Sequence, residues 1–348
     1  RRGPPAAGLA APCSSILLHR IDSMTRPPFL SRLALPLIAA PMLRVSGIEL
    51  VSAACANGIV GAFPTPNART LDELEAWLVR LRDEAMQARD AGRSVGPWCP
   101  NLIMRREPAL LRAEIERFIA HRCEVVITSV GSPASVMPML KDANIAVLAD
   151  VATMRHAERA IEAGVDGLVL LTAGAGGQTG WANPFAFVRA VRAFFDGPIV
   201  LAGGLSDGAS LHAAEVLGCD LGYMGTRFIA TRESMASGAY KRMLVESSLD
   251  DIQLTRAFTG LQANFLRPSI AATGLDPEAL PEHLTPAEAR ERFGGGSAAH
   301  ERPARWADIW SAGHSVSGVD GAPSVAELVA FVKRGYDEAS GRRGRAVA

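Results

Sequence analysis

The 348-residue sequence lacks features that several classes of protein require. It has no net charge, because 36 basic residues balance 36 acidic ones, whereas nucleic-acid binders normally carry a basic excess. Its longest candidate for a membrane span, residues 33–42, contains two prolines and is about half the roughly 18 residues that a span needs. We therefore expect neither a nucleic-acid partner nor a membrane partner.

Cysteine is also scarce, and its distribution excludes two further classes of protein. The five cysteines are scattered, with no C-x-x-C pair and none beside a histidine at metal-ligand spacing. An odd, scattered set argues against a disulfide framework and against a zinc site. We expect reduced thiols, no bound metal and a cytoplasmic location.

The first 23 residues carry no clear periodicity, and Met24 resembles a native start ahead of the first apolar run. We interpret residues 1–23 as a disordered or non-native leader and exclude them from the fold prediction. A presequence is the alternative, because this stretch contains arginines followed by an apolar middle. The tail from residue 341 is expected to fray.

Eight short apolar runs recur along the chain, each followed by a helical stretch. They cover residues 37–41, 59–63, 94–101, 125–130, 145–151, 167–173, 198–204 and 221–228. They begin about 26 residues apart on average, which is the length of one strand–helix unit. Their near-continuous apolar character is typical of parallel strands covered by helices. The pattern predicts an α/β fold, a (β/α)8 TIM barrel. A doubly wound open sheet is less consistent, because no glycine-rich loop follows the first run.

The pattern changes after the eighth run. Residues 232–312 combine helical stretches with loops rich in proline and glycine, and a periodic helix returns at 324–336. We predict a barrel formed by residues 24–231 and 313–340. Residues 232–312 are predicted to form an inserted, mainly helical lid or small subdomain.

Two glycine-containing segments close the seventh and eighth runs. Glycine lets backbone amides approach a phosphate closely, and the loops after strands seven and eight are the usual phosphate site of a barrel. We predict a phosphate site here, with two ordinary tight turns as the alternative. The residues concerned are Ala202, Gly203, Gly204, Met224, Gly225 and Thr226.

Three other strand ends carry candidate ligand contacts. Ala40, Pro41 and Met42 offer small residues and an adaptable methionine that suit a flat ring, although core packing explains them too. Residues 174–180 contain four glycines, so the backbone there approaches a ligand or bends sharply. Asp150 ends an apolar run, where a buried carboxylate is either paired or a functional acid.

Taken together, these motifs resemble the nitronate monooxygenase family, formerly called 2-nitropropane dioxygenases. These are FMN-dependent barrels related to a flavin enoyl reductase. The similarity runs in order from about residue 33 to 338, and each segment alone is modest. The segments are 40–42, 100–102, 174–180, 202–208, 224–228 and 310–313.

The resemblance implies FMN as the cofactor and a set of contacts at the strand ends. It places the flavin ring against residues 40–42 and a hydrogen bond from Asn101 near the ring or its ribityl chain. The glycine motifs after strands seven and eight then hold the phosphate. The remaining predicted cofactor contacts are Ser129, Asp150, Gly177, Gly180, Ala202 and Met224. For Ser129, a Ser-Pro helix start is an equally simple explanation.

The chain departs from the family at one chemically important position. The family carries a histidine in the sixth loop, as a base or a substrate-positioning group, and this chain has Gln178. Glutamine cannot accept a proton near neutral pH, so we expect poor proton abstraction from a neutral nitroalkane. A nitronate already lacks that proton. His314 stands where the family's late segment has glutamine, so a compensating swap and an unrelated loop histidine are both open.

Three functions are consistent with these observations. The first, which we favour, is FMN-dependent oxidation of an alkyl nitronate with O2, with Gln178 and His314 as the catalytic candidates. The second is an enoyl-reductase-like FMN enzyme that reduces or dehydrogenates an acyl thioester with NAD(P)H, since the large insertion can admit a bulky carrier. The third is a non-catalytic flavin-binding barrel. In each case we expect a small-molecule ligand and a homodimer.

Overall fold

The structure, a computed structural model, describes residues 26–294 and 303–341. The predicted leader at residues 1–23, with Cys13, lies outside the described residues. Within the described ranges, no helix combines the length and apolar character needed to cross a membrane. The four cysteines in these ranges, at positions 55, 99, 123 and 219, are unbonded and buried.

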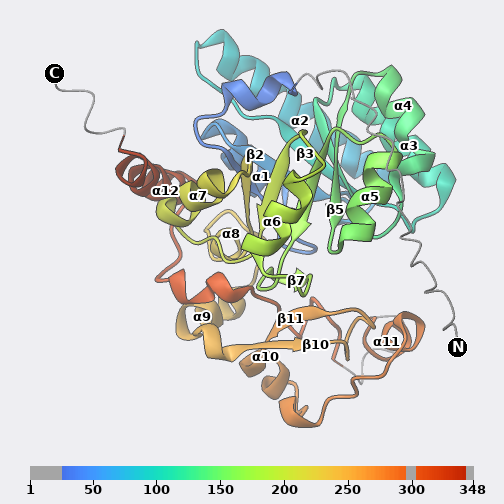
Figure 1. The fold of residues 1–348 in the computed structure, drawn as a ribbon, viewed down its shortest axis with the longest axis vertical. Coiled ribbons are helices and arrows are strands. Elements are labelled where there is room, and N and C mark those ends of the chain that lie inside the picture. The colour runs from blue at the N-terminus through green and yellow to red at the C-terminus, as the bar shows by residue number, and fades with distance from the viewer. Residues whose placement is uncertain (1–25, 295–302, 342–348) are drawn as a thin grey trace, which may run out of the picture.

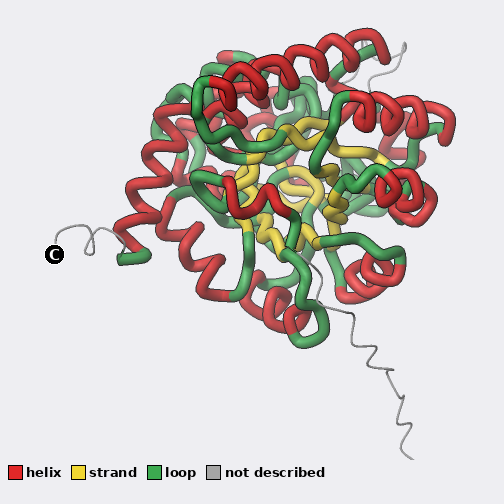
Figure 2. Tube along the Cα trace, turned by 90° about the horizontal axis from the view of Figure 1, so that it is seen from above, coloured by secondary structure: helices red, strands yellow, loops and turns green. Residues whose placement is uncertain are grey.

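Eight parallel strands close into a barrel in the order β1-β2-β3-β4-β5-β6-β8-β9. Seen from above, the strands form a ring inside a layer of helices (Figure 2). The first and last strands pair directly, with Ile38 opposite Tyr223. The strands are β1 (Leu37–Ala39), β2 (Val60–Pro64), β3 (Trp98–Ile103), β4 (Val125–Ser129), β5 (Ala146–Val151), β6 (Gly167–Leu171), β8 (Ile199–Ala202) and β9 (Leu221–Met224). The predicted (β/α)8 fold is confirmed.

Helices alternate with these strands and cover the outside of the ring (Figure 1). They are α1 (Ile48–Ala56), α2 (Leu71–Asp90), α3 (Pro108–Ala120), α4 (Met137–Asp142), α5 (Met154–Glu162), α6 (Pro184–Arg192), α7 (Gly208–Leu217) and α12 (Val325–Ala339). The start of α2 shows why the chain becomes helical there: Thr70 accepts a hydrogen bond from the Glu73 amide at 3.1 Å. The last helix, α12, packs beside α7 and completes the outer layer.

Several strands end earlier than the sequence predicted, and the ends of β8 and β9 bear on the site. β8 stops at Ala202 because Gly203 and Gly204 adopt φ values of 121° and 80°, which no strand residue has. β9 stops at Met224, and the following residues form the short helix α8 (Thr226–Ile229). Both turns lie at the carboxyl ends of the strands, where barrel enzymes place their sites.

Apolar side chains fill the barrel inside and out. Ile38, Val60, Ile127 and Val200 belong to a buried cluster inside the ring, which Phe29 joins from the 3-10 helix at Pro28–Arg32. A larger cluster lies between the strands and the surrounding helices. This double layer is what a parallel barrel requires, and it makes the strand ends a rigid platform.

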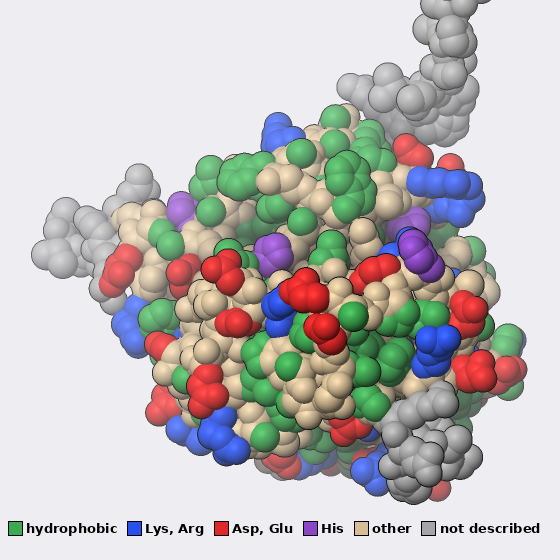
Figure 3. Space-filling view, turned by 90° about the horizontal axis from the view of Figure 1, so that it is seen from below, with side chains coloured by type: hydrophobic (Ala, Val, Ile, Leu, Met, Phe, Trp, Pro, Cys, Tyr) green, Lys and Arg blue, Asp and Glu red, His purple; other side chains and the backbone are tan. Residues whose placement is uncertain are grey.

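The segment after α8 forms a compact unit on one side of the barrel, drawn in orange in Figure 1. It contains α9 (Gly238–Glu246), β10 (Ile252–Thr255), β11 (Ala263–Leu266), α10 (Arg267–Ala272) and α11 (Pro286–Phe293). A cluster including Phe258, Phe265, Phe293 and Ile309 gives it a core of its own. Acidic, basic and apolar side chains are interspersed on the face seen from below (Figure 3).

A small sheet accompanies the helices of this segment. β10 pairs antiparallel with β11, and β11 pairs antiparallel with β7 (Gly177–Gln178), which comes from the glycine-rich loop of the barrel. Sequence patterns missed the sheet because β10 and β11 have four residues each and are not joined by a short hairpin turn. The third strand has two residues, too few to carry any periodicity.

Candidate active site

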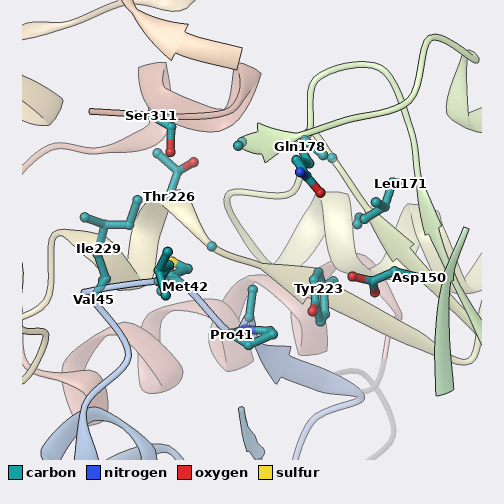
Figure 4. Close-up of a pocket in the computed structure, with 18 of the residues that line it drawn as sticks. Pro41, Met42, Val45, Asp150, Leu171, Gln178, Tyr223, Thr226, Ile229 and Ser311 are labelled. Atoms are coloured by element: carbon teal, nitrogen blue, oxygen red, sulfur yellow. The ribbon is translucent and has the colours of Figure 1, made fainter. Parts of the chain in front are cut away.

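A cavity of about 270 Å³ lies at the carboxyl ends of the barrel strands. Figure 4 shows its two sides, one built by the barrel and one by β7 and the inserted segment. We call the barrel side the floor: Ala40, Pro41, Met42, Asn101, Ser129, Asp150, Ala202, Gly203, Gly204, Tyr223 and Gly225. We call the other side the roof: Gln178, Tyr240, Trp306, Trp310, Ser311 and Ser315.

The floor at the end of β1 is held by hydrogen bonds. The Ala40 amide donates to the Met224 carbonyl at 3.0 Å, and the Met42 amide donates to Ser46 Oγ at 2.9 Å. Ser46 Oγ in turn donates to the Ala40 carbonyl at 3.1 Å, and Asn67 Nδ2 donates to the Met42 carbonyl at 2.9 Å. This turn therefore presents a fixed apolar surface to a ligand.

The ends of β3 and β4 supply a polar pair. Ser129 Oγ donates to Asn101 Oδ1 at 2.9 Å, and both side chains are buried. The bond fixes the orientation of the Asn101 amide through its oxygen. Its nitrogen is then the atom that can donate to a ligand in the cavity.

The ends of β8 and β9 form a backbone cradle. A Cβ at Gly203 would lie 2.6 Å from Thr172 Oγ1, so only glycine fits there, whereas a Cβ at Gly204 would meet nothing within 4 Å. Gly225 lies close to Met42, whose Sδ would be 3.5 Å from an added Cβ. Bare backbone therefore faces the cavity at three points, which is the arrangement that a phosphate group can approach.

Asp150 is the carboxyl group of the floor. Its Oδ1 is buried and has no hydrogen-bond partner in the described part of the chain. Burial raises the pKa of this carboxyl to about 7. The Tyr223 side chain lies beside it in Figure 4, and burial, together with the charge of Asp150, raises the pKa of that phenol well above its usual range.

The roof is assembled from segments far apart in the sequence. Tyr240 stacks on Trp310 with ring centroids 4.9 Å apart, and its hydroxyl donates to the Ser311 carbonyl. Trp306 stacks on Phe265 at 5.1 Å and has a φ of 66°, a conformation uncommon outside glycine. These aromatic rings give the cavity an apolar upper wall.

Gln178 reaches the cavity from β7, where it pairs with Ala263 of β11. The loop is tied to the insertion on both sides of this residue. The Thr179 amide donates to the Gln262 carbonyl at 3.1 Å, and Asn264 Nδ2 donates to the Ala175 carbonyl at 2.7 Å. Gln178 is therefore held by the inserted sheet.

Most of the predicted site residues line this one cavity. They are Ala40, Pro41, Met42, Asn101, Ser129, Asp150, Gly177, Gln178, Ala202, Gly203, Gly204, Gly225 and Thr226. Three do not line it: Gly180 is packed under the Leu171 carbonyl, Met224 is buried in the outer core, and His314 is exposed.

His314 therefore does not join Gln178 as the swap hypothesis expected. Its amide donates to the Gly174 carbonyl at 2.9 Å, which fastens the 3-10 helix His314–Gly318 to the outside of the glycine loop. Its side chain packs toward Gly174 and is exposed. No histidine lies among the described residues that line the cavity.

The sequence interpretation missed Tyr223 and five of the roof residues, Tyr240, Trp306, Trp310, Ser311 and Ser315. Tyr223 had a usable signal, because it sits two residues before the Gly225 motif at a strand end. Tyr240, Trp306 and Ser315 had none, because only the folded insertion brings them over the barrel. Trp310 and Ser311 belonged to a segment quoted for the family resemblance but were given no role.

The model of the nitronate monooxygenase family matches residues 28–333. The chain belongs to the nitronate monooxygenase family. Its members are flavin-dependent oxidoreductases, and the family predicted from the sequence is confirmed. The match includes the insertion as well as the barrel, so both sides of the cavity fall within the family's own architecture.

Two curated relatives carry different names. The chain is 32% identical over 189 residues to a nitronate monooxygenase of Paraburkholderia phytofirmans, covering 51% of this chain and 50% of the relative. It is 27% identical over 241 residues to a (3aS,4S,5R,7aS)-5-hydroxy-7a-methyl-1-oxo-octahydro-1H-indene-4-carboxyl-CoA dehydrogenase of Mycobacterium tuberculosis, covering 68% of this chain and 64% of the relative. The chain thus spans about half to two thirds of these relatives' length.

Two solved structures are similar over nearly their whole length. FabK from Thermotoga maritima superposes with a TM-score of 0.74 at 25% identity, covering 90% of this chain and 97% of that one. A nitroalkane oxidase from Streptomyces ansochromogenes superposes with a TM-score of 0.70, also at 25% identity, covering 90% of this chain and 99% of that one. The barrel and the insertion are therefore shared with both.

Proposed function

We propose that this protein binds FMN in the cavity and oxidises an alkyl nitronate with O2. Membership of the nitronate monooxygenase family supports the reaction class. The observation that carries the choice of substrate is the lining of the cavity, in which Gln178 is present and histidine is absent from the described residues. A site without a roof base suits a substrate that arrives already deprotonated.

The residues present fit FMN. The floor offers an apolar surface at Ala40–Met42, an amide donor at Asn101, and bare backbone at Gly203, Gly204 and Gly225. A flat ring, its polar edge and a phosphate match these three surfaces in turn. When bound, FMN supplies the electron chemistry, accepting electrons from the substrate and passing them to O2.

The protein's own groups then position the substrate. The Gln178 amide can donate a hydrogen bond to a nitronate oxygen, and the stacked rings of Tyr240 and Trp310 exclude water from the upper wall. None of these three side chains can take a proton from a carbon atom near neutral pH. We therefore expect turnover of the anion and little turnover of the neutral nitroalkane.

Anaerobic reduction of the FMN-loaded protein tests this proposal directly. Ethylnitronate should bleach the flavin absorbance near 450 nm, and air should restore it. Neutral nitroethane should bleach it at least about tenfold more slowly, since it needs a base that the roof does not offer. Equal rates for the two substrates would contradict the role given to Gln178, and failure to retain flavin would contradict the proposal as a whole.

A second candidate is an FMN-dependent reductase or dehydrogenase of an acyl thioester that uses NAD(P)H. One observation favours it: the relative from M. tuberculosis that matches 68% of this chain is named as a carboxyl-CoA dehydrogenase. Bleaching by NADPH and not by ethylnitronate, with reoxidation by an enoyl thioester, would select this function. The homodimer and the cytoplasmic location stay predictions from the sequence.

A further inference from the structure

Asp150 is the unexplained group of the floor. Four buried side-chain polar atoms in the described ranges have no hydrogen-bond partner, and one is Asp150 Oδ1. The other three belong to Glu114, Arg117 and Arg227, each of which forms an ion pair with an oppositely charged side chain. A buried polar atom without a partner is costly, so a ligand that supplies one is the expected explanation.

The surroundings of Asp150 do not compensate a negative charge. Among the described residues that line the cavity, Asp150 is the one carboxyl group, and none is Lys, Arg or His. The neighbouring strand ends add Ser129 from β4 and Leu171 from β6, neither of which titrates in the ordinary range. Helices α4 and α5 cover the outer side of β5, away from the cavity.

The charge of Asp150 acts on two titratable groups, Tyr223 of β9 and Cys99 of β3. The charge of Asp150 helps to raise the pKa of both, after burial. Both are therefore uncharged at neutral pH, and neither can form an ion pair with a carboxylate. Burial raises the pKa of Asp150 itself to about 7, so its neutral form is well populated under ordinary conditions.

We propose that Asp150 holds a proton at its carboxyl and donates it in a hydrogen bond to the bound flavin, so that flavin binding takes up one proton wherever the empty site is ionised. This inference rests on the proposed function, because it needs a flavin on the floor. A flavin offers ring nitrogens and carbonyl oxygens as acceptors, and its phosphate is an anion. An ionised Asp150 would present no hydrogen-bond donor to the ring nitrogens and carbonyl oxygens, and its charge would repel the phosphate.

The same geometry places the ionisable group of the site on the floor and not on the roof. Gln178 stands on the roof, at the position where we predict the family's histidine, and its amide does not titrate. The one carboxyl group of the described lining, Asp150, lies on the floor, on the opposite side of the ligand. The pH dependence of the site is then a property of cofactor binding through the floor. It is not a property of proton abstraction from the substrate.

Titration of FMN affinity against pH tests the inference. The probe is FMN, its fluorescence quenching gives Kd, and the window is pH 7 to 8.5, above the second ionisation of the phosphate near about 6. In the wild type we expect Kd to rise toward about tenfold per pH unit above the pKa of the free site. In Asp150→Asn, which keeps a donor but cannot ionise, we expect Kd to stay within about twofold across the window.

The matched control is Asp196→Asn, because Asp196 is an exposed aspartate outside the cavity lining. It should follow the wild-type titration. A wild-type Kd that does not change with pH, or an Asp150→Asn variant that follows the wild type, would overturn the inference while leaving the FMN site intact. Failure of the wild type to bind FMN at any pH would instead overturn the proposed function.

A second measurement uses the wild-type protein alone and does not depend on whether Asp150→Asn folds. Calorimetry of FMN binding to the wild type, in two buffers with different ionisation enthalpies, counts the protons taken up. We expect an uptake that approaches one proton at pH 8.5 and falls to about half a proton at pH 7, still above the ionisation of the phosphate. No uptake at pH 8.5 would contradict the inference even if Asp150→Asn cannot be prepared.

Discussion

The floor and the roof of the cavity are built in different ways. The floor is the end of a closed parallel sheet, where hydrogen bonds and buried apolar side chains hold each strand. The roof depends on the inserted segment, which meets the barrel through the two-residue strand β7. Within the segment, the rings of Tyr240 and Trp310 stack on each other. The rigid floor suits a cofactor that all members of the family share. The roof, assembled from separate segments, suits a substrate that differs from one relative to another.

The chemical groups of the floor and the roof also differ. The floor carries the one carboxyl group among the described lining residues, whereas the roof offers an amide, hydroxyls and aromatic rings. The departure from the family that we predicted at Gln178 falls on the roof. Family membership therefore constrains cofactor binding more tightly than it constrains the substrate, which is consistent with the different names of the two curated relatives.

The largest effect that separates the two sides is expected at Gly204. Gly204→Val places a side chain into the cradle, because nothing lies within 4 Å of its Cβ position and that space belongs to the cavity. We expect FMN affinity to fall by at least about 100-fold, as a blocked phosphate site loses several hydrogen bonds at once. Fluorescence quenching of FMN measures this change.

Gly274→Val is the matched control for this variant. Gly274 has the same φ of 80° and also nothing within 4 Å of its Cβ position, but it is exposed in the insertion. Both variants therefore pay a similar backbone strain of roughly 1–2 kcal/mol. Equal FMN affinity in the two variants would mean that the phosphate does not sit in this cradle.

The next effect is expected on the roof. Gln178→His returns an ionisable base to the cavity, so turnover of neutral nitroethane should rise by about tenfold to 100-fold, while turnover of ethylnitronate should change by less than about threefold. FMN affinity should stay unchanged. Initial rates of O2 consumption with each substrate measure the ratio.

His314→Ala serves as the control for this roof variant. Because His314 is exposed and lies outside the cavity lining, its removal should leave both rates unchanged. A selective loss of nitroethane turnover in His314→Ala would revive the hypothesis that this histidine acts in the pocket. It would also show that the loop rearranges when the substrate binds.

The barrel and its floor could be read from the sequence because their signals are local. Each strand is a contiguous apolar run, and Ala40, Asn101 and Gly203 lie at the ends of such runs, so topology alone brings them together. The roof could not be read in the same way. Trp306 reaches the cavity through stacking on Phe265, and Gln178 through pairing with Ala263, and neither contact leaves a periodic trace.

His314 shows the limit of reasoning by position in a motif. Its place in the segment after Trp310 suggested a compensating histidine, but the 3-10 helix that begins at His314 turns the side chain out of the cavity. Asp150 shows the opposite case. An acidic residue that ends an apolar run was expected to be paired or functional, and the structure gives it no ion pair among the described residues.

The stability of the flavin-free protein should report the buried carboxyl of the floor. Asp150 has an ordinary pKa of 3.8, and burial raises the pKa to about 7 in the folded protein. As pH rises from about 4 to about 7, the unfolded chain releases its proton first, so the folded state loses stability, by at most about 1.4 kcal/mol per pKa unit. Above about pH 7 the loss levels off, because the folded state is ionised too.

Asp150→Asn removes this loss. We expect its Tm, relative to the wild type, to be roughly 4 °C higher at pH 8 than at pH 4.5, measured by calorimetry without flavin. Asp196→Asn, at an exposed position, should show no such change. A Tm difference between Asp150→Asn and the wild type that is the same at both pH values would contradict a raised pKa at Asp150.

The smallest effect is expected from the aromatic wall of the roof. Trp306→Ala removes a ring that lines the cavity and stacks on Phe265, a contact worth about 0.5–1.5 kcal/mol. We expect KM for ethylnitronate to rise by about threefold to tenfold, with FMN affinity and kcat changed by less than about twofold. This follows from our proposal that the roof binds substrate and the floor binds cofactor. Trp181→Ala is the control, since Trp181 is 72% exposed and does not line the cavity. If Trp306→Ala instead weakened FMN binding as strongly as it raised KM, the separation between a cofactor side and a substrate side would not hold.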